Sequence, residues 1–277
     1  MELIRGTSTP EVWLAACEYL EKQPDHEDYD VFLHVTNPSP LSRADAMVLK
    51  GVDDFLTNHG GASINTVAET IFPLQDYLRG GKKAVFDTYP ERMKKIHAVR
   101  KDRQWGNYAM RILRQKDRDG TIYNPLKDLL KKIQDHGEYK ATFELGRGHA
   151  MDGIETELHD LEKGGDDIAI YDGAADRRPM YGHLPCLMHL SVKLDHGTIR
   201  INATYRSHYY VQRLLGNLIG LARLQYFLAH EAGLEIGPLT INSTYAKLDT
   251  GEGKWRMRDI KELLAESRQL YAVKDAA

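Results

Sequence analysis

Cys186, Arg206, Ser207 and Asn217 are the residues whose types and order could support nucleophilic chemistry. A cysteine thiolate is a strong nucleophile, and a guanidinium beside it favours the ionised form. An adjacent arginine and serine can bind an anion. A carboxamide can pair with the donors and acceptors of a heterocycle. The four residues thus offer a nucleophile, an anion-binding pair and a group that reads a ring.

A β-hairpin is predicted to position Cys186. Apolar residues fall on even positions in 188–194 and on odd positions in 199–205. Because directly opposed residues share a face, a two-residue turn at His196-Gly197 joins these strands in register. Extended to the open end of the hairpin, this register sets Cys186 opposite Ser207.

Arg206 needs a departure from this register to reach the thiol. Strict alternation turns Arg206 to the other face of the sheet, so we predict a bulge or a strand end near this point. Arg206 and Ser207 would then form an anion-binding pair next to Cys186. The alternative is a buried cysteine beside a structural arginine, because burial is the usual fate of a free cysteine.

Asn217 lies in a predicted helix, 208–230, among leucines at helical spacing. A buried amide needs hydrogen-bond partners, which could be backbone groups or a bound heterocycle. Gly216 and Gly220 beside it would let a ligand or another helix approach closely. Both interpretations stay open for these positions.

The elements that must hold these residues indicate one α+β domain over 1–277, with a mostly helical part, 1–140, and a sheet-rich part, 141–277, that carries the candidate site. The remaining patterns predict helices over 10–22, 42–58, 66–78, 90–100, 125–135, 154–163 and 258–270, and strands over 29–35, 141–145, 167–171, 187–194, 198–205 and 239–245.

Composition narrows the class of protein. The formal net charge of -3 gives no global field toward nucleic acid or an anionic membrane, and no apolar run is long enough to span a bilayer. The chain has two cysteines, too few for a disulfide framework, so we expect a cytoplasmic protein with Cys17 buried in the first helix. No HxH, HExxH or zinc-type cysteine pair is present, so no metal is expected.

Three segments also resemble one known family. Pro185-Cys186, Tyr205-Arg206-Ser207 and Gly216-Asn217 are similar, at matching intervals, to the nucleophile, phosphate-binding and base-reading elements of thymidylate synthases. The turn 233–237 resembles the one after the family's long helix, and 105–108 resembles the segment with its active-site tyrosine. The resemblance covers residues 150–250 well. It implies a mixed sheet packed with a long buried helix, and a homodimer.

The family's chemistry assigns roles to these positions. The Cys186 thiolate would add to C6 of a pyrimidine nucleotide, and C5 would then take a one-carbon unit from 5,10-methylenetetrahydrofolate. Arg206 and Ser207 would bind the phosphate. Asn217 would read the O4/N3 edge of the base, which favours uracil over cytosine. Homodimerisation would complete the site.

Two further catalytic positions follow from the same resemblance. Tyr108 matches the active-site tyrosine, and Glu69 is a candidate for the carboxylate that acts through water. A solvated or capping glutamate near a helix start is the alternative for Glu69.

Several positions depart from the family. Leu187 replaces a histidine, and Tyr209 replaces the aspartate that contacts the pterin. Lys247 and Asp249 stand where a histidine and a tyrosine contact the sugar, so they are candidate substrate contacts. The cofactor side would comprise Trp105, Tyr209 and Gly216, and the arginines normally lent by the partner subunit could be replaced by Arg177 and Arg178.

These departures leave three hypotheses. The first is an enzyme that methylates or hydroxymethylates C5 of a pyrimidine nucleotide. The second is a ligand-sensing or partner-binding protein that keeps the pocket without the reaction. The third keeps the nucleophile but acts on a different heterocycle, with Lys247 and Asp249 as new recognition groups.

Overall fold

A mixed β-sheet forms the centre of the computed structural model, which describes residues 1–39, 41–99, 107–116, 120–135, 144–145 and 185–272. The strand order is β1-β2-β9-β7-β6-β5, and β8 pairs with β9. Strands β1 and β2 run parallel, as do β7 and β9, whereas β2–β9, β6–β7 and β5–β6 are antiparallel. The strands are β1 (Glu2–Gly6), β2 (Glu27–Val35), β5 (Glu144–Leu145), β6 (Leu187–Asp195), β7 (Thr198–Tyr205), β8 (His208–Tyr209) and β9 (Glu235–Lys247).

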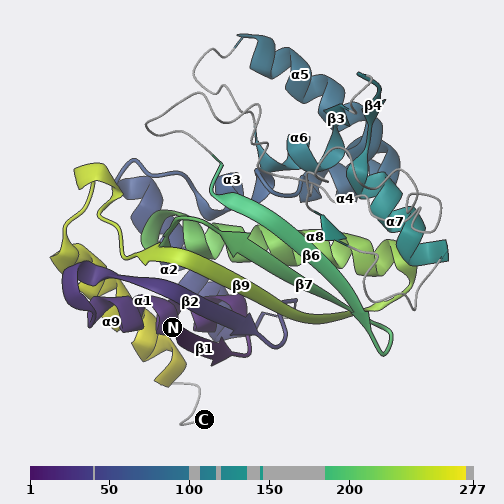
Figure 1. Ribbon diagram of the computed structural model, residues 1–277. Coiled ribbons are helices and arrows are strands. Elements are labelled where there is room, and N and C mark those ends of the chain that lie inside the picture. The colour runs from purple at the N-terminus through teal and green to yellow at the C-terminus, as the bar shows by residue number, and fades with distance from the viewer. Residues whose placement is uncertain (40, 100–106, 117–119, 136–143, 146–184, 273–277) are drawn as a thin grey trace, which may run out of the picture.

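Helices cover one face of this sheet. Figure 1 shows α8 behind β6, β7 and β9, and a second group of helices, α4 to α7, beyond the end of β6. A small hairpin, β3 (Gln115–Lys116) with β4 (Ile122–Tyr123), lies in that group. The helices are α1 (Thr9–Glu21), α2 (Arg43–Asn58), α3 (Ile64–Glu69), α4 (Leu74–Lys83), α5 (Tyr89–Val99), α6 (Tyr108–Leu113), α7 (Pro125–Asp135), α8 (Leu215–Ala232) and α9 (Met257–Ala272), with short helical turns η1 (Pro24–His26), η2 (Ala84–Thr88), η3 (Tyr210–Leu214) and η4 (Gly251–Gly253).

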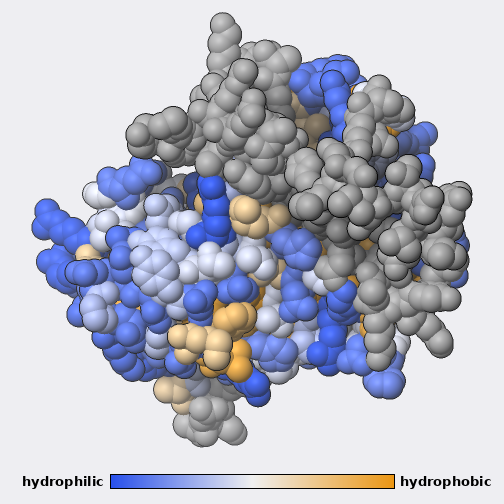
Figure 2. Space-filling view, in the orientation of Figure 1, coloured by the Kyte–Doolittle hydropathy of each residue, from blue (hydrophilic) through white to orange (hydrophobic). Residues whose placement is uncertain are grey.

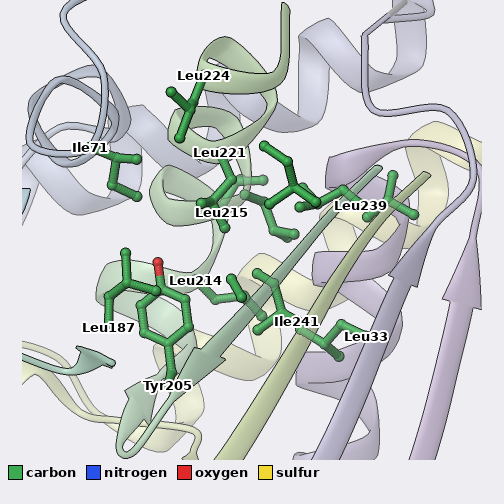
Figure 3. Close-up of a cluster of buried hydrophobic side chains, with 14 of the residues drawn as sticks. Leu33, Ile71, Leu187, Tyr205, Leu214, Leu215, Leu221, Leu224, Leu239 and Ile241 are labelled. Atoms are coloured by element: carbon green, nitrogen blue, oxygen red, sulfur yellow. The ribbon is translucent and has the colours of Figure 1, made fainter. Parts of the chain in front are cut away.

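The core lies between α8 and the sheet. Leucines of α8 meet Leu33 of β2, Leu239 and Ile241 of β9, and Tyr205 of β7 (Figure 3). Burying a Leu or Ile side chain contributes about 1.5–3 kcal/mol. This packing fixes α8, and with it Asn217, against the end of the hairpin that carries Cys186.

Among the described residues, no helix lies on the other face of the sheet (Figure 1). Two cross-strand rows lie on it: Phe32 with Asn242 and Thr204, and His34 with Thr240 and Asn202. Phe32 and His34 are half-buried, and Asn202 is exposed. Figure 2 shows this face as a mixture of apolar and polar surface.

The α+β class and most predicted elements are confirmed. Ser42 is the N-cap of α2, and its hydroxyl accepts the Asp45 N–H. A serine at this position satisfies a backbone donor that has no partner within the helix. Helix α7 and strand β7 have the predicted bounds. Cys17 is fully buried in α1, as expected.

Two predicted helices are wrong in part. The predicted helix 66–78 is two helices, α3 and α4, because Pro73 lacks an N–H and disfavours helical backbone at Phe72. The predicted helix 208–230 starts later: β8 pairs with β9, and the π-turn η3 precedes α8.

Strand β1 is missing from the predicted elements altogether. Two predicted elements, the helix 154–163 and the strand 167–171, lie outside the described residues.

Candidate functional site

The β6–β7 hairpin carries Cys186 at its open end. Asp195 pairs with Thr198 across the predicted turn, where His196 and Gly197 have φ values of 48° and 79°. Positive φ at both central residues is the requirement of a tight hairpin turn with the twist of its strands. The predicted register is therefore confirmed at the turn end.

The predicted irregularity is confirmed at the other end of the hairpin. The register shifts between Leu187 and His189, so Met188 is an extra residue, and Leu187 pairs with Tyr205. The Arg206 N–H donates to the Cys186 carbonyl over 2.9 Å. Cys186 thus lies opposite Arg206, and its predicted pairing with Ser207 is wrong because the bulge moves the register by one residue.

Tyr108 holds the start of β6 from the helical side. Its hydroxyl accepts the backbone N–H of Cys186 over 3.0 Å and that of Leu187 over 3.3 Å. Asn107 caps α6 and donates to the Tyr89 hydroxyl over 3.0 Å, which fixes the beginning of this helix. Burial, and then the charge of Cys186, raises the pKa of Tyr108 to about 12, so its hydroxyl is protonated at neutral pH.

The Cys186 thiol is half-buried and has two guanidinium groups near it. Burial raises the pKa of this thiol, while the charges of Arg206 and Arg213 and a hydrogen bond from Arg206 lower it. Burial outweighs the two cations, so the pKa is above that of an ordinary cysteine. The expected net shift toward the thiolate is therefore not observed in the ligand-free protein.

Sequence reasoning missed two members of the site. Arg213 lies four residues before Asn217, in the π-turn at the start of the helical segment, and π-turns often occur at functional sites. Tyr205 lies at the end of β7 and is fully buried. Burial raises the pKa of Tyr205, and the charges of Tyr108 and Cys186 raise it further, which places its hydroxyl near both. The four-residue spacing from Asn217 was the available signal for Arg213.

Asn217 is buried and belongs to a polar network. Its Nδ2 lies 3.0 Å from Nε2 of His208, and Nδ1 of His208 lies 3.0 Å from Oγ of Ser243. Burial lowers the pKa of His208 to about 3, so its ring is neutral. Nε2 therefore accepts from Asn217, and Nδ1–H donates to Ser243. One amide N–H and the carbonyl of Asn217 have no other partner among the described residues.

Glu69 is the last residue of α3, and the carbonyl of the next residue, Thr70, accepts the Ala109 N–H of α6 over 2.7 Å. Its carboxylate pairs with Arg223 over 3.2 Å, and burial raises its pKa although Arg223 lowers it. The predicted helix start is wrong here, because α3 ends at Glu69. Its charge helps to raise the pKa of Tyr89, whose hydroxyl accepts a hydrogen bond from Asn107. Glu69 thus connects to the site through α6.

Ser207 follows Arg206 in the bend between β7 and β8. Its hydroxyl has no hydrogen-bond partner within the described part of the chain. Tyr209, two residues on, is 40% exposed and pairs with Lys247 on β9. Lys247 is engaged by Glu27, with its Nζ 2.8 Å from Oε2. The predicted substrate contact by Lys247 thus competes with an ion pair.

Asp249 has a structural role, and its predicted sugar contact stays a prediction. Its Oδ1 accepts the N–H groups of Val211 and Gln212, over 2.9 and 3.3 Å, and its Oδ2 accepts the Gly251 N–H. The carboxylate is buried, and that burial raises its pKa. Asp249 caps the helical segment that leads to Asn217.

Gly216 has a packing role, and its predicted cofactor contact stays a prediction. A Cβ here would lie 2.5 Å from Cβ of Val67, and one at Gly220 would lie 2.9 Å from the Ala68 carbonyl oxygen. The glycines let α3 approach α8, which was the alternative interpretation. The other predicted ligand contacts, Trp105, Arg177 and Arg178, lie outside the described residues.

A separate pocket of about 620 Å³ lies on the helical side of the protein. Leu49 of α2, Leu78 of α4 and Tyr226 of α8 contribute apolar walls. Arg223, which also lines it, pairs with Glu69. The pocket therefore borders the start of α3, through Ile64 and Asn65, and Cys186 is not among its lining residues.

In the part of the chain that the structure describes, no helix has the length and apolarity to cross a membrane. Within those same residues, no group of three or more His, Cys, Asp or Glu side chains is placed to hold a metal ion. No protein-family model matches the chain, and no curated protein matches it either.

Proposed function

We propose that the protein is a thymidylate-synthase-like transferase that adds a one-carbon unit to C5 of a pyrimidine nucleotide through a covalent Cys186 adduct. The observation that carries this proposal is the bulge at Met188, which brings the thiol next to Arg206 while Tyr108 holds the strand start. A strand irregularity that aims one side chain is common beside active sites.

The residues divide the work. Sγ of Cys186 forms a bond to C6 of the ring, which makes C5 nucleophilic, and the S–C6 bond breaks again after C5 loses its proton. Arg206 and Ser207 bind the phosphate, because a guanidinium and an open hydroxyl offer several donors. Asn217 uses its remaining N–H for O4 and its carbonyl for N3–H of uracil.

The raised thiol pKa sets the order of events. A nucleotide phosphate bound at Arg206 leaves the guanidinium charge in place and excludes water from the thiol. Because the thiol is protonated in the free protein, the thiolate must form as the ring binds. Tyr108 is protonated and near the thiol. Glu69 supports the Tyr89–Asn107 contact and acts as a positioning carboxylate for α6.

The cofactor side fits a folate poorly. Tyr209 offers no carboxylate to the N–H groups of a pterin, and Val67 fills the space beside Gly216. We therefore derive no step through folate. 5,10-Methylenetetrahydrofolate is the first one-carbon donor to test. It would supply the methylene group and, for a methyl product, the hydride that reduces it, whereas a hydroxymethyl product would take up water instead.

Mass spectrometry of nucleotides tests the proposal. The protein is incubated with 5,10-methylenetetrahydrofolate and, separately, UMP, dUMP, CMP and dCMP. We expect a uracil nucleotide to gain a methyl or hydroxymethyl group in the wild type and not in Cys186→Ala. A 5-fluoro-pyrimidine nucleotide should also label Cys186 covalently. A chain that neither modifies nor is trapped by any of these nucleotides contradicts the proposal.

A ligand-sensing protein is the second candidate, and the raised thiol pKa together with Tyr209 favours it. Here the same nucleotides bind without modification. Calorimetric titration separates the two candidates, because Cys186→Ala would leave the affinity of a sensor unchanged. The third candidate, the same nucleophilic chemistry on a different heterocycle, is distinguished by identifying what co-purifies with the protein.

The sheet face that no helix of the described residues covers supports a homodimer. Oδ1 of Asn242 and Nε of Arg200 are buried without a hydrogen-bond partner among the described residues, and Asn242 lies on that face beside Phe32. A second copy of the chain would give such groups partners. Light scattering after gel filtration should report twice the chain mass, and Phe32→Asp should reduce it to that of one chain. An unchanged monomeric mass in the wild type would exclude the dimer.

A further inference from the structure

The guanidinium of Arg213 has no ion-pair partner among the described residues. The side chain is exposed, and in the described ranges of the chain it makes no hydrogen bond and no ion pair. Most cations near this end of the molecule are engaged: Arg223 pairs with Glu69, and Lys247 pairs with Glu27. Arg213 is therefore a guanidinium with five donors available to a ligand.

The position of Arg213 brings it near the Cys186 thiol. It lies on the π-turn η3 and precedes Asn217 by four residues, so the two share one side of the helical segment. Its charge lowers the pKa of both Cys186 and Tyr108, which places the guanidinium near these two groups. The N–H groups beneath it, those of Val211 and Gln212, are already occupied by Asp249.

Tyr205 supplies a second and independent sign of a ligand. Its side chain is fully buried, and its hydroxyl has no partner among the described residues. Tyr205 pairs with Leu187, and the next residue, Arg206, donates its N–H to the Cys186 carbonyl, so this hydroxyl belongs to the strand end that carries the thiol. Buried hydroxyl groups without partners are rare in folded proteins, and one beside a reactive group is often completed by a ligand or water.

We propose that Arg213 binds a carboxylate or phosphate group of a small molecule beside Cys186, at a position separate from the anion bound by Arg206 and Ser207. Both unpaired groups here, Arg213 and Tyr205, are hydrogen-bond donors, so the ligand presents acceptor oxygens. That this ligand is the second reactant, which would then be an anionic one-carbon donor, rests on the proposed function. The oxyanion site itself does not.

Alkylation of Cys186 tests the site without any turnover. The thiolate displaces iodide from neutral iodoacetamide or from anionic iodoacetate, and the ratio of the two rates reports a cation that holds the carboxylate. Replacing Arg213 with glutamine should lower the iodoacetate to iodoacetamide ratio by about five-fold, the effect of one unit charge at about 4 Å in water. Arg213→Lys should restore part of the ratio.

Two controls keep the result specific. Arg79, on α4, is also exposed and has no ion pair in the described residues, so Arg79→Gln should leave the ratio unchanged. Cys186→Ala should abolish labelling, because Cys17 is fully buried. Circular dichroism and thermal unfolding check that each variant is folded. An unchanged ratio in folded Arg213→Gln overturns the proposal.

Competition identifies the anion. Inorganic phosphate and acetate are added at equal ionic strength to the iodoacetate reaction. Protection by either anion that disappears in Arg213→Gln supports the site and assigns it to phosphate or carboxylate. Equal protection in the wild type and the variant overturns it. If mass spectrometry finds no nucleotide modification, the alkylation ratio and the anion protection can still be measured. The proposed function and the oxyanion site can therefore fail separately.

Discussion

At the scale of single residues, Tyr205 is fully buried and its hydroxyl has no partner among the residues that the structure describes, although its ring stacks on His208 with centroids 4.1 Å apart. A buried polar group without a partner costs about 1–3 kcal/mol. The fold therefore carries a destabilising group next to its candidate nucleophile. Such a cost is typical of functional sites, where stability and activity conflict.

Tyr205→Phe should therefore stabilise the ligand-free protein, raising the free energy of unfolding by about 1 kcal/mol. Urea denaturation measures the change. Tyr210→Phe is the matched control, because the Tyr210 hydroxyl donates to Ser243 over 3.2 Å and its loss should cost about 1 kcal/mol. A Tyr205→Phe variant less stable than the wild type would show that the hydroxyl has a partner.

The residues of the site were predictable to different degrees. Cys186 and Arg206 follow from alternation in two strands and from the bulge that alternation required. Tyr108 follows from the family resemblance. For Arg213 the only signal was its four-residue spacing from Asn217. Tyr205 was not predictable, because a tyrosine in an apolar strand pattern does not show that its hydroxyl lacks a partner.

At the scale of elements, the segment from β8 to α8 depends on Asp249. The family position had suggested a sugar contact, but sequence alone does not show that a residue far along the chain will cap a helix start. The break at Pro73 was readable in principle. The late start of α8 was not readable from the sequence. Residues 208 and 209 form β8 in place of a helix because they pair with β9, which is distant in sequence.

Asp249→Ala should lower the free energy of unfolding by about 2 kcal/mol, since two backbone N–H groups of the helical turn lose their acceptor. Asp249→Asn should cost less, because the amide oxygen can replace Oδ1. Thermal unfolding measures both. Glu266→Ala, an exposed position on α9, is the control and should change little. Equal stability of Asp249→Ala and the wild type would remove the capping role.

At the scale of the whole molecule, the stability of the fold should depend on pH through His208. Its pKa is about 3 when folded, against about 6.5 for an ordinary histidine. Between these values the unfolded chain binds a proton that the folded protein does not. The stabilising contribution is thus present above about pH 6.5 and is lost as the pH falls toward 3.

Urea unfolding at a series of pH values checks this dependence. Below about pH 6.5, the slope of unfolding free energy against pH should be smaller in His208→Gln than in the wild type, by up to about 1.4 kcal/mol per pH unit. His196→Gln, at the exposed turn, should keep the wild-type slope. Parallel curves for His208→Gln and the wild type would contradict a buried neutral ring.

The class of the whole fold was predictable from local patterns, because strands and helices alternate their apolar residues with different periods. The order of the strands was not. Parallel pairing of β7 with β9 and of β1 with β2 depends on long-range packing. Strand β1, which lacks a long alternating run, became a strand because β2 offers an edge.

The close contact of α3 with α8 bears on how mutational scans of this protein are to be interpreted. At Gly216, even a methyl group would collide with Val67 and push apart two helices, one carrying Glu69 and the other Asn217. An alanine scan would therefore score Gly216 as intolerant whether or not it touches a ligand. Shortening Val67 to alanine in the same chain should restore tolerance, which separates steric sensitivity from participation in binding.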